Sequence, residues 1–195
     1  MNTETTTHTT TTGLDDLTKI VAAVALHAST DQTRYCLTGI YITGQNIQAT
    51  DSYTLGRYTP AEPITTGEPA LINARELTTA LNNLNKAAGK ATTTASLTIT
   101  GDKWQLTATN GETTIGSYNG HTIPAEFPNS EQLFTMAKPA TTPYEPTGMN
   151  PDYLERITKA SRKISKITPL LMAIWQTPSK PIIYTTTTQA GQLEQ

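Results

Sequence analysis

Apolar residues recur every three to four positions in three separate stretches of the chain, which is the spacing of one face of an α-helix. The stretches run from about Leu14 to His27, from about Ala74 to Ala88 and from about Pro151 to Ile164. Asn73 and Asn150 stand immediately before the second and third stretches, where an asparagine side chain can accept hydrogen bonds from free backbone N–H groups. The pattern therefore predicts three amphipathic helices, two of them with a defined start.

Between these helices the pattern changes to short runs of alternating or continuous apolar and β-branched residues, which favour strands. Strands are predicted over residues 35–43, 47–50, 96–100, 104–109, 113–118, 170–175 and 181–187. Gly101-Asp102 predicts a turn, and Asn110-Gly111 predicts a type I′ hairpin turn. The chain is thus predicted to repeat a helix followed by strands three times, which makes it an α+β protein.

Composition along the chain predicts how these units are grouped. Residues 1–13 are almost all Thr, so we expect a disordered tail there. The proline-containing stretch 135–148 is expected to be a linker between a domain at 14–134 and a half-unit at 149–195. Because so small a half-unit cannot bury its own apolar faces, it is expected to pack on the first domain or on a second copy of the chain.

The overall charge and the single cysteine restrict the function classes. The 195 residues carry 14 Lys and Arg against 16 Asp and Glu, which excludes a uniformly basic coat and leaves only a local basic face for nucleic acid. Cys36 allows no internal disulfide and no cysteine-based zinc site, and within its predicted strand we expect a buried thiol. No apolar run is long enough to cross a membrane, so we expect no membrane partner and a reduced, cytoplasmic location.

Basic residues concentrate on and just after the second and third predicted helices. The set consists of Arg75, Lys86, Lys90, Arg156, Lys159, Arg162, Lys163 and Lys166. On the third helix all but Arg162 fall within roughly a quarter of the circumference at 100° per residue. Two explanations stay open: a face that neutralises the phosphates of duplex DNA without reading bases, or a solvated face that keeps the protein soluble. Because no aromatic residues interleave with the cations, the pattern does not indicate a platform for single strands.

Residues that could carry catalysis do not form a recognisable arrangement. His8, His27 and His121 lack metal-ligand spacing, and no paired carboxylate accompanies Asp51. No glycine-rich phosphate-binding loop is present. The sequence therefore predicts that the chain is not an enzyme and that it has no catalytic residue, no metal site and no cofactor.

Two motifs in the first domain resemble one protein family. Arg34-Tyr35-Cys36-Leu37-Thr38-Gly39-Ile40 is followed, after a short hairpin, by Ala49-Thr50-Asp51-Ser52-Tyr53-Thr54-Leu55. The bacterial sliding clamp, the β subunit of the replicative DNA polymerase, has Arg-x-x-Leu-x-Gly and Ala-Thr-Asp-Gly-aromatic/His-Arg-Leu at this spacing in its middle domain. Weaker resemblances follow in the family's order, at Phe127-Pro128-Asn129, Met149-Asn150-Pro151-Asp152-Tyr153-Leu154 and Lys180-Pro181-Ile182-Ile183.

The resemblance implies a reduced version of the clamp, with the DNA-clamp fold in which helices cover one face of antiparallel sheets. Residues 14–134 correspond to the family's middle domain and 149–195 to the end of its last domain. The family's remaining parts have no counterpart, a reduction that would suit a phage genome. Family members encircle duplex DNA through non-specific backbone contacts and tether a DNA polymerase, with a clamp loader as a further partner. The family's ring has twelve helices, so four chains of three helices would complete one; a dimer with a gap and a monomer stay open.

The family's partners insert a short peptide into a pocket between its middle and last domains. Carried over by motif, that pocket consists of Leu37, Thr50, Ser52, Tyr53, Thr54, Leu55, Pro128 and Leu133. Ser52 and Thr54 replace the family's Gly and Arg, and its final apolar-Met-Pro-apolar strand motif is absent. The resemblance therefore implies an altered pocket, which is either incomplete or finished by another subunit.

Two other functions stay open. A clamp-like decoy or adaptor would bind polymerase or clamp-loader partners without encircling DNA, and it would need only the pocket. A Thr-rich structural protein of a virion or surface would explain the composition but not the ordered motifs. The basic face of the third helix distinguishes a clamp from a decoy, because only a clamp needs that face exposed to DNA.

Overall fold

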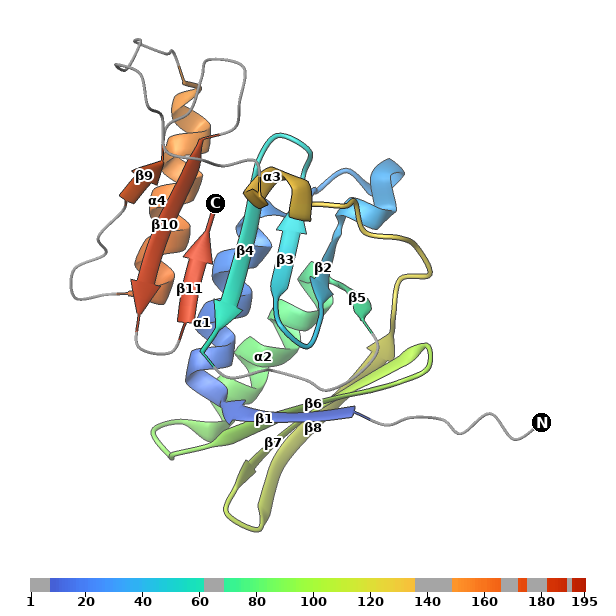
Figure 1. Cartoon of the computed structure of the whole chain (residues 1–195). Coiled ribbons are helices and arrows are strands. Elements are labelled where there is room, and N and C mark those ends of the chain that lie inside the picture. Colours follow the sequence, from blue (N-terminus) through green and yellow to red (C-terminus); the bar gives the residue numbers. More distant parts are fainter. Residues whose placement is uncertain (1–7, 62–68, 136–148, 166–171, 175–181, 189–190) are drawn as a thin grey trace.

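A computed structural model of the chain describes residues 8–61, 69–135, 149–165, 172–174, 182–188 and 191–195. Three long helices, α1 (Leu14–Val24), α2 (Ala74–Ala88) and α4 (Pro151–Ile164), lie on one side of a large antiparallel sheet (Figure 1). The helix α1 packs against both α2 and α4, and so it is the middle helix of this layer. The remaining helical segments are short: η1 (Ala25–His27), η2 (Gln32–Leu37) and α3 (Glu131–Thr135).

The larger sheet combines strands from distant parts of the sequence. Its seven strands are ordered β5-β2-β3-β4-β11-β10-β9, and neighbouring strands are antiparallel. Their bounds are β2 Gly39–Ile42, β3 Ile47–Thr50, β4 Leu55–Pro60, β5 Ala70–Asn73, β9 Met172–Ile174, β10 Ile183–Thr188 and β11 Gly191–Glu194. Because β4 pairs with β11, the C-terminal unit packs on the first domain, which is one of the two arrangements that the sequence left open.

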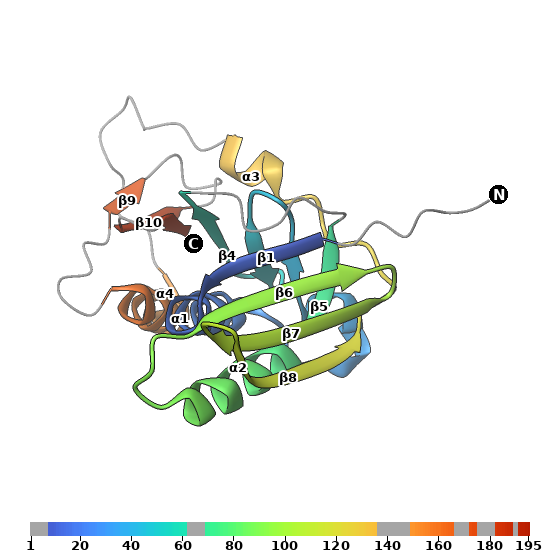
Figure 2. The ribbon, with the colours of Figure 1, turned by 90° about the horizontal axis from the view of Figure 1, so that it is seen from below.

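A second, four-stranded sheet crosses one end of the helical layer (Figure 2). Its order is β1-β6-β7-β8, with β1 at His8–Gly13, β6 at Thr94–Thr100, β7 at Lys103–Asn110 and β8 at Thr113–His121. The strand β1 pairs with β6 along six residues, so the predicted disordered tail is wrong for residues 8–13. Residues 1–7 of that predicted tail and most of the predicted linker lie outside the described residues.

The helices begin where the sequence pattern placed them because their caps form. The Asn73 side chain accepts hydrogen bonds from the N–H groups of Arg75 and Glu76, and the Asn150 side chain accepts one from Asp152. Each apolar stripe enters one shared core, in which Leu17 and Val21 of α1 and Leu81 of α2 are almost fully buried. The three predicted helices and the α+β class are therefore confirmed.

Two local predictions are corrected. Cys36 lies in the 3-10 segment η2 and is only partly buried, so it is not the buried strand thiol that was expected. The β7–β8 hairpin turns at Gly111-Glu112, because Asn110 pairs directly with Thr113. Gly111 has a φ of 60°, and a glycine with positive φ at the first loop position is the type II′ pattern rather than type I′.

Candidate peptide cleft and nucleic-acid interface

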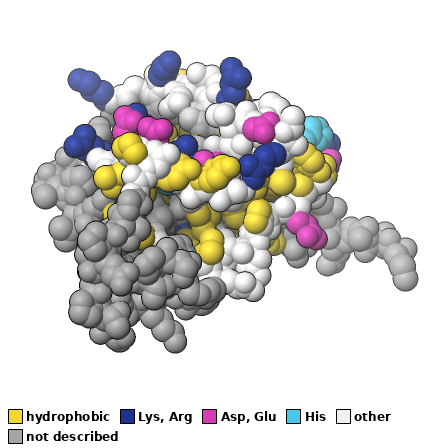
Figure 3. Space-filling model, turned by 90° about the horizontal axis from the view of Figure 1, so that it is seen from above, with side chains coloured by type: hydrophobic (Ala, Val, Ile, Leu, Met, Phe, Trp, Pro, Cys, Tyr) yellow, Lys and Arg dark blue, Asp and Glu magenta, His cyan; other side chains and the backbone are white. Residues whose placement is uncertain are grey.

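A cleft of about 340 Å³ opens where α4, α3, the turn after β3 and the end of β11 meet. Figure 3 shows apolar side chains gathered on this surface, beside residues that the structure does not describe. The cleft is lined by Thr50, Ser52, Tyr53, Thr54, Leu55, Leu133, Phe134, Met149, Tyr153, Ile157, Ile182, Tyr184 and Gln195. Six of the eight predicted pocket residues are thus brought together. Leu37 is buried elsewhere, and Pro128 lines a separate depression beside Tyr41.

Aromatic and branched apolar side chains form most of the cleft. The rings of Tyr53 and Tyr153 stack with centroids 6.2 Å apart and an interplanar angle of 20°. Tyr53 is 73% exposed, so this stacked pair stands at the rim, while Ile157 of α4 lies buried below it. The Tyr184 hydroxyl lies 3.5 Å from the sulfur of Met149. Such a surface can accept an apolar side chain of a partner and offers only a few polar groups to orient it.

The turn of residues 51–54 forms one wall and is held by its own hydrogen bonds. The Asp51 carboxylate accepts from the N–H groups of Tyr53, at 2.9 Å, and Thr54, at 2.7 Å. Ser52 has a φ of 79°, a left-handed conformation that glycine adopts without steric cost, which explains why a glycine suits this position of the motif. The guanidinium of Arg34 donates to the Ser52 hydroxyl and helps to hold this conformation.

Arg156 belongs to this wall and not to a free basic face. Its guanidinium forms an ion pair with Asp51 and donates to the Thr54 hydroxyl at 2.7 Å. Burial opposes the ionisation of Asp51, but the hydrogen bond from Arg156 and the two backbone N–H groups outweigh it and hold the pKa of the carboxyl below its usual value. A cation from α4 therefore stands beside Thr54, where the family motif carries its own arginine. Arg156 is thus engaged within the protein, and its contact with DNA stays a prediction.

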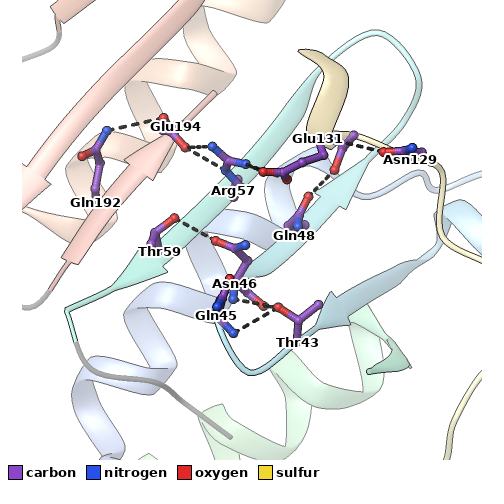
Figure 4. A network of polar contacts seen from close by, with 11 residues as sticks. Thr43, Gln45, Asn46, Gln48, Arg57, Thr59, Asn129, Glu131, Gln192 and Glu194 are labelled. Carbon is purple, nitrogen blue, oxygen red and sulfur yellow. Dashed lines mark hydrogen bonds and ion pairs between the residues drawn. The ribbon is translucent and has the colours of Figure 1, made fainter. Parts of the chain in front are cut away.

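A second arginine, Arg57 of β4, ties two other walls together (Figure 4). It forms ion pairs with Glu194 of β11 and with Glu131 of α3, the latter at 3.1 Å. Its guanidinium also lies 3.5 Å above the centroid of the Phe134 ring. Because the Arg57 side chain is only 11% exposed, these contacts fix both α3 and β11 beside the cleft. A terminal strand is thus present although its residues differ from the family's final motif, and Gln195 after it lines the cleft.

His27 is buried below the turn and has no exposed surface. A Cβ on Gly56 of β4 would lie 2.4 Å from Cδ2 of its ring, so only glycine allows this close approach. Neither ring nitrogen has a hydrogen-bond partner among the described residues, although the Gln195 side chain lies nearby. Burial, and to a smaller extent the charge of Arg156, lower the pKa of His27 to about 4, so the ring is neutral at pH 7.

Although Lys103 is exposed on β7, the helical side carries most of the exposed cations of the described chain. Six of the eight predicted residues are exposed there: Arg75, Lys86, Lys90, Lys159, Arg162 and Lys163. Lys159 pairs with Glu155 at 2.7 Å, and on α1 the Lys19 amine pairs with two aspartates, which raises its pKa. Lys166 lies outside the described residues. Figure 3 shows Lys and Arg side chains along its upper edge, which is the side of the helices.

Two other kinds of feature are absent from the described residues. None of their His, Cys, Asp and Glu side chains form a group of three or more that could hold a metal ion. None of the described helices is long and apolar enough to span a membrane.

No protein-family model and no curated protein sequence matches this chain. Solved structures do. A sliding clamp from Bartonella birtlesii, solved bound to griselimycin, superposes with a TM-score of 0.65 at 12% identity over 100% of this chain and 66% of that one. A Pseudomonas aeruginosa sliding clamp, also bound to griselimycin, gives 0.61 at 12% identity over 97% of this chain and 64% of that one. The β subunit of DNA polymerase III from Thermotoga maritima gives 0.56 at 12% identity, over 96% and 63%.

The helical layer and the antiparallel sheets therefore define a DNA-clamp fold. More particularly, the fold is that of the bacterial DNA polymerase III β subunits, as the motifs of the first domain predicted. At 12% identity the likeness concerns the fold, and the chain spans less than two thirds of the length of each of these clamps.

Proposed function

We propose that this chain is a sliding-clamp processivity factor that encircles duplex DNA and tethers a DNA polymerase. The observation that carries the proposal is the joint presence of a clamp fold, exposed cations on its helical side and an apolar cleft between its first and last units. Each feature alone is common among proteins, but a clamp needs all three.

The helical side is suited to loose contact with DNA phosphates. Its exposed cations lie on α2 and α4, on either side of α1, so they are spread across the layer. Lys and Arg side chains that contact only phosphates neutralise their charge without reading the bases. Binding of this kind weakens steeply as the salt concentration rises. This is the contact that a protein moving along DNA requires.

The cleft is suited to an apolar anchor of a partner peptide. Its floor contains Leu55 and Ile157, and its rim carries the stacked tyrosines and the hydroxyls of Ser52 and Thr54. A large apolar or aromatic side chain that fills such a site can supply most of the binding free energy. The partner in this proposal is a peptide segment of the polymerase, and a clamp loader would use the same cleft. Griselimycin, which is bound to two of the similar clamps, is a convenient probe.

Assembly completes the proposal. The described residues of one chain supply three long helices, so four chains would supply the twelve of the clamp ring. Encirclement predicts a topological behaviour: the protein stays on closed circular DNA at a salt concentration that removes simple phosphate contacts, and it leaves when the DNA is cut.

The experiment follows from this behaviour. Dilute subunits are mixed with nicked circular DNA, concentrated so that rings can close around it, and passed through a sizing column in high salt. Wild type should travel with the circle in high salt and be released by a single restriction cut. Lys86→Glu/Lys159→Glu/Lys163→Glu should bind the same DNA more weakly than wild type at low salt, where phosphate contacts contribute. Griselimycin binding with no retention on circles would favour the decoy or adaptor instead, and equal retention on circular and linear DNA would also contradict encirclement.

A further inference from the structure

The described chain contains three units of the same order, each a long helix followed by antiparallel strands. They are α1 with β2–β4, α2 with β6–β8, and α4 with β9–β11. The last strands of the first and third units pair with each other: β4 and β11 run antiparallel, with Tyr58 opposite Leu193 and Arg57 opposite Glu194. The last strand of the second unit, β8, stands at the edge of its sheet, and no described strand pairs with its outer side.

The two last strands β4 and β8 share a Gly-x-Tyr sequence. In both strands the glycine packs against the helical segment of its own unit. In β4, Gly56 packs on the ring of His27; in β8, a Cβ on Gly116 would lie 3.0 Å from Leu84 of α2. The tyrosine two residues later therefore points to the helical side in both strands. Tyr58 is 1% exposed, with β11 beside it, but Tyr118 is 38% exposed. Tyr118 thus lacks the neighbouring strand that covers its counterpart.

The outer edge of β8 carries neither charged residues nor prolines, and one irregularity near Ile115 is its single protective feature among the described residues. Residues 113–120 contain no Lys, Arg, Asp, Glu or Pro, and the residues after the irregularity near Ile115 form a regular ladder with β7. Exposed edges of monomeric proteins are usually protected by charges, prolines or a covering segment. An uncharged edge also places no like charges opposite each other when two identical strands meet.

We propose that β8 pairs antiparallel with β8 of a second copy of this chain, through a two-fold axis. Within the described chain, the last strands of the first and third units, β4 and β11, already pair with each other. The last strand of the second unit, β8, is therefore left without such a partner. That strand has no other last strand to meet except its own copy, and an antiparallel pair of identical strands is isologous. The pairing would bring α2 beside α2 of the copy and continue the helical layer across the junction.

This inference deepens the proposed ring and rests on it, but it is tested without DNA. The test variant is Ser117→Lys/Asn119→Lys, which places two charges on the edge strand. Its matched control is Gln105→Lys/Thr107→Lys, because these residues are the direct cross-strand partners on β7 and lie on the same face one strand inward. Sedimentation equilibrium across a wide concentration range gives the mass and the association constant of each protein.

Wild type and the control should associate alike, and the edge variant should associate at least about tenfold more weakly. In a Cys36→Ser background, Ser117→Cys should be joined to a second chain by a short thiol cross-linker, and Thr107→Cys should not. Thermal unfolding checks that the edge variant is folded, and the cross-link tests the pairing even where that variant is not. A wild type that is monomeric throughout, or an edge variant that associates like the control, would overturn the pairing.

The two failures are distinguishable. A β8-linked dimer that is not retained on circular DNA would remove the proposed clamp function and leave the pairing. Retention on circles that the edge variant shares with wild type would remove the pairing and leave the clamp function.

Discussion

Lowering the pH from 7 to 5 should destabilise this protein through one buried histidine. His27 has a pKa of about 4 in the fold against an ordinary 6.5, chiefly because burial disfavours its charged form. Between these values the unfolded chain binds a proton that the folded chain does not, so stability is lost as the pH falls through 6.5 and the loss levels off below 4. From the two pKa values the loss at pH 5 is about 2 kcal/mol.

Urea unfolding at pH 7 and pH 5 measures this loss directly. His27→Leu removes the titrating ring, so its stability should change between the two pH values by about 2 kcal/mol less than that of wild type. The carboxyl groups titrate in both proteins and cancel in the difference. The matched control is His121→Leu, because His121 is an exposed histidine that pairs with Asp102 at the surface. It should keep most of the wild-type pH dependence. If wild type and His27→Leu lost the same stability, His27 would not be a neutral buried group and the reasoning would be refuted.

Three further predictions concern the packing around the cleft and are checked by urea unfolding at pH 7. Arg156→Met should lower the free energy of unfolding by about 2 kcal/mol, because it leaves the half-buried carboxylate of Asp51 without its guanidinium partner. The control Lys163→Met should lower it by less than about 0.5 kcal/mol. Equal losses in the two variants would contradict the pairing of Arg156 with Asp51. Arg57→Met should lower the free energy of unfolding by about 3 kcal/mol, because Glu131 and Glu194 both lose the cation that they share. An unchanged free energy of unfolding would contradict the network in Figure 4. Gly56→Ala should cost about 2 kcal/mol because the new methyl group meets a packed ring, and Gly116→Ala should cost less because it meets the end of a flexible side chain; the reverse order would contradict the packing described.

The helices could be predicted because their signals are local. Caps at Asn73 and Asn150 and the apolar stripes are written within a few residues, and the second and third helices begin and end where the pattern placed them. The strand β1 gave no such signal. Its run of threonines has the β-branched side chains that suit a strand but no alternation of apolar and polar residues. Only its pairing with β6, which is more than eighty residues away, makes it a strand.

The cleft could be predicted only as far as its short motifs reach. Thr50 and residues 52–55 were found because they belong to one contiguous motif of the resembling family. Ile157, Ile182 and Tyr184 were missed as cleft residues, because each lies there only when α4 and β10 dock beside β4 and the turn. Arg156 was assigned to the basic stripe for the same reason: helical spacing gives its angle around α4, but the contact with Asp51 joins residues 105 positions apart.

The proposed clamp function requires copies of this chain to close into a ring wide enough for duplex DNA. Cryo-electron microscopy of the protein, at a concentration where its mass has stopped rising, would show whether such a ring forms. We expect closed rings of four chains, with twelve long helices around a central opening and the α2 helices of neighbouring copies side by side. Compact particles without an opening, or single chains with the cleft exposed and β8 unpaired, would contradict this expectation.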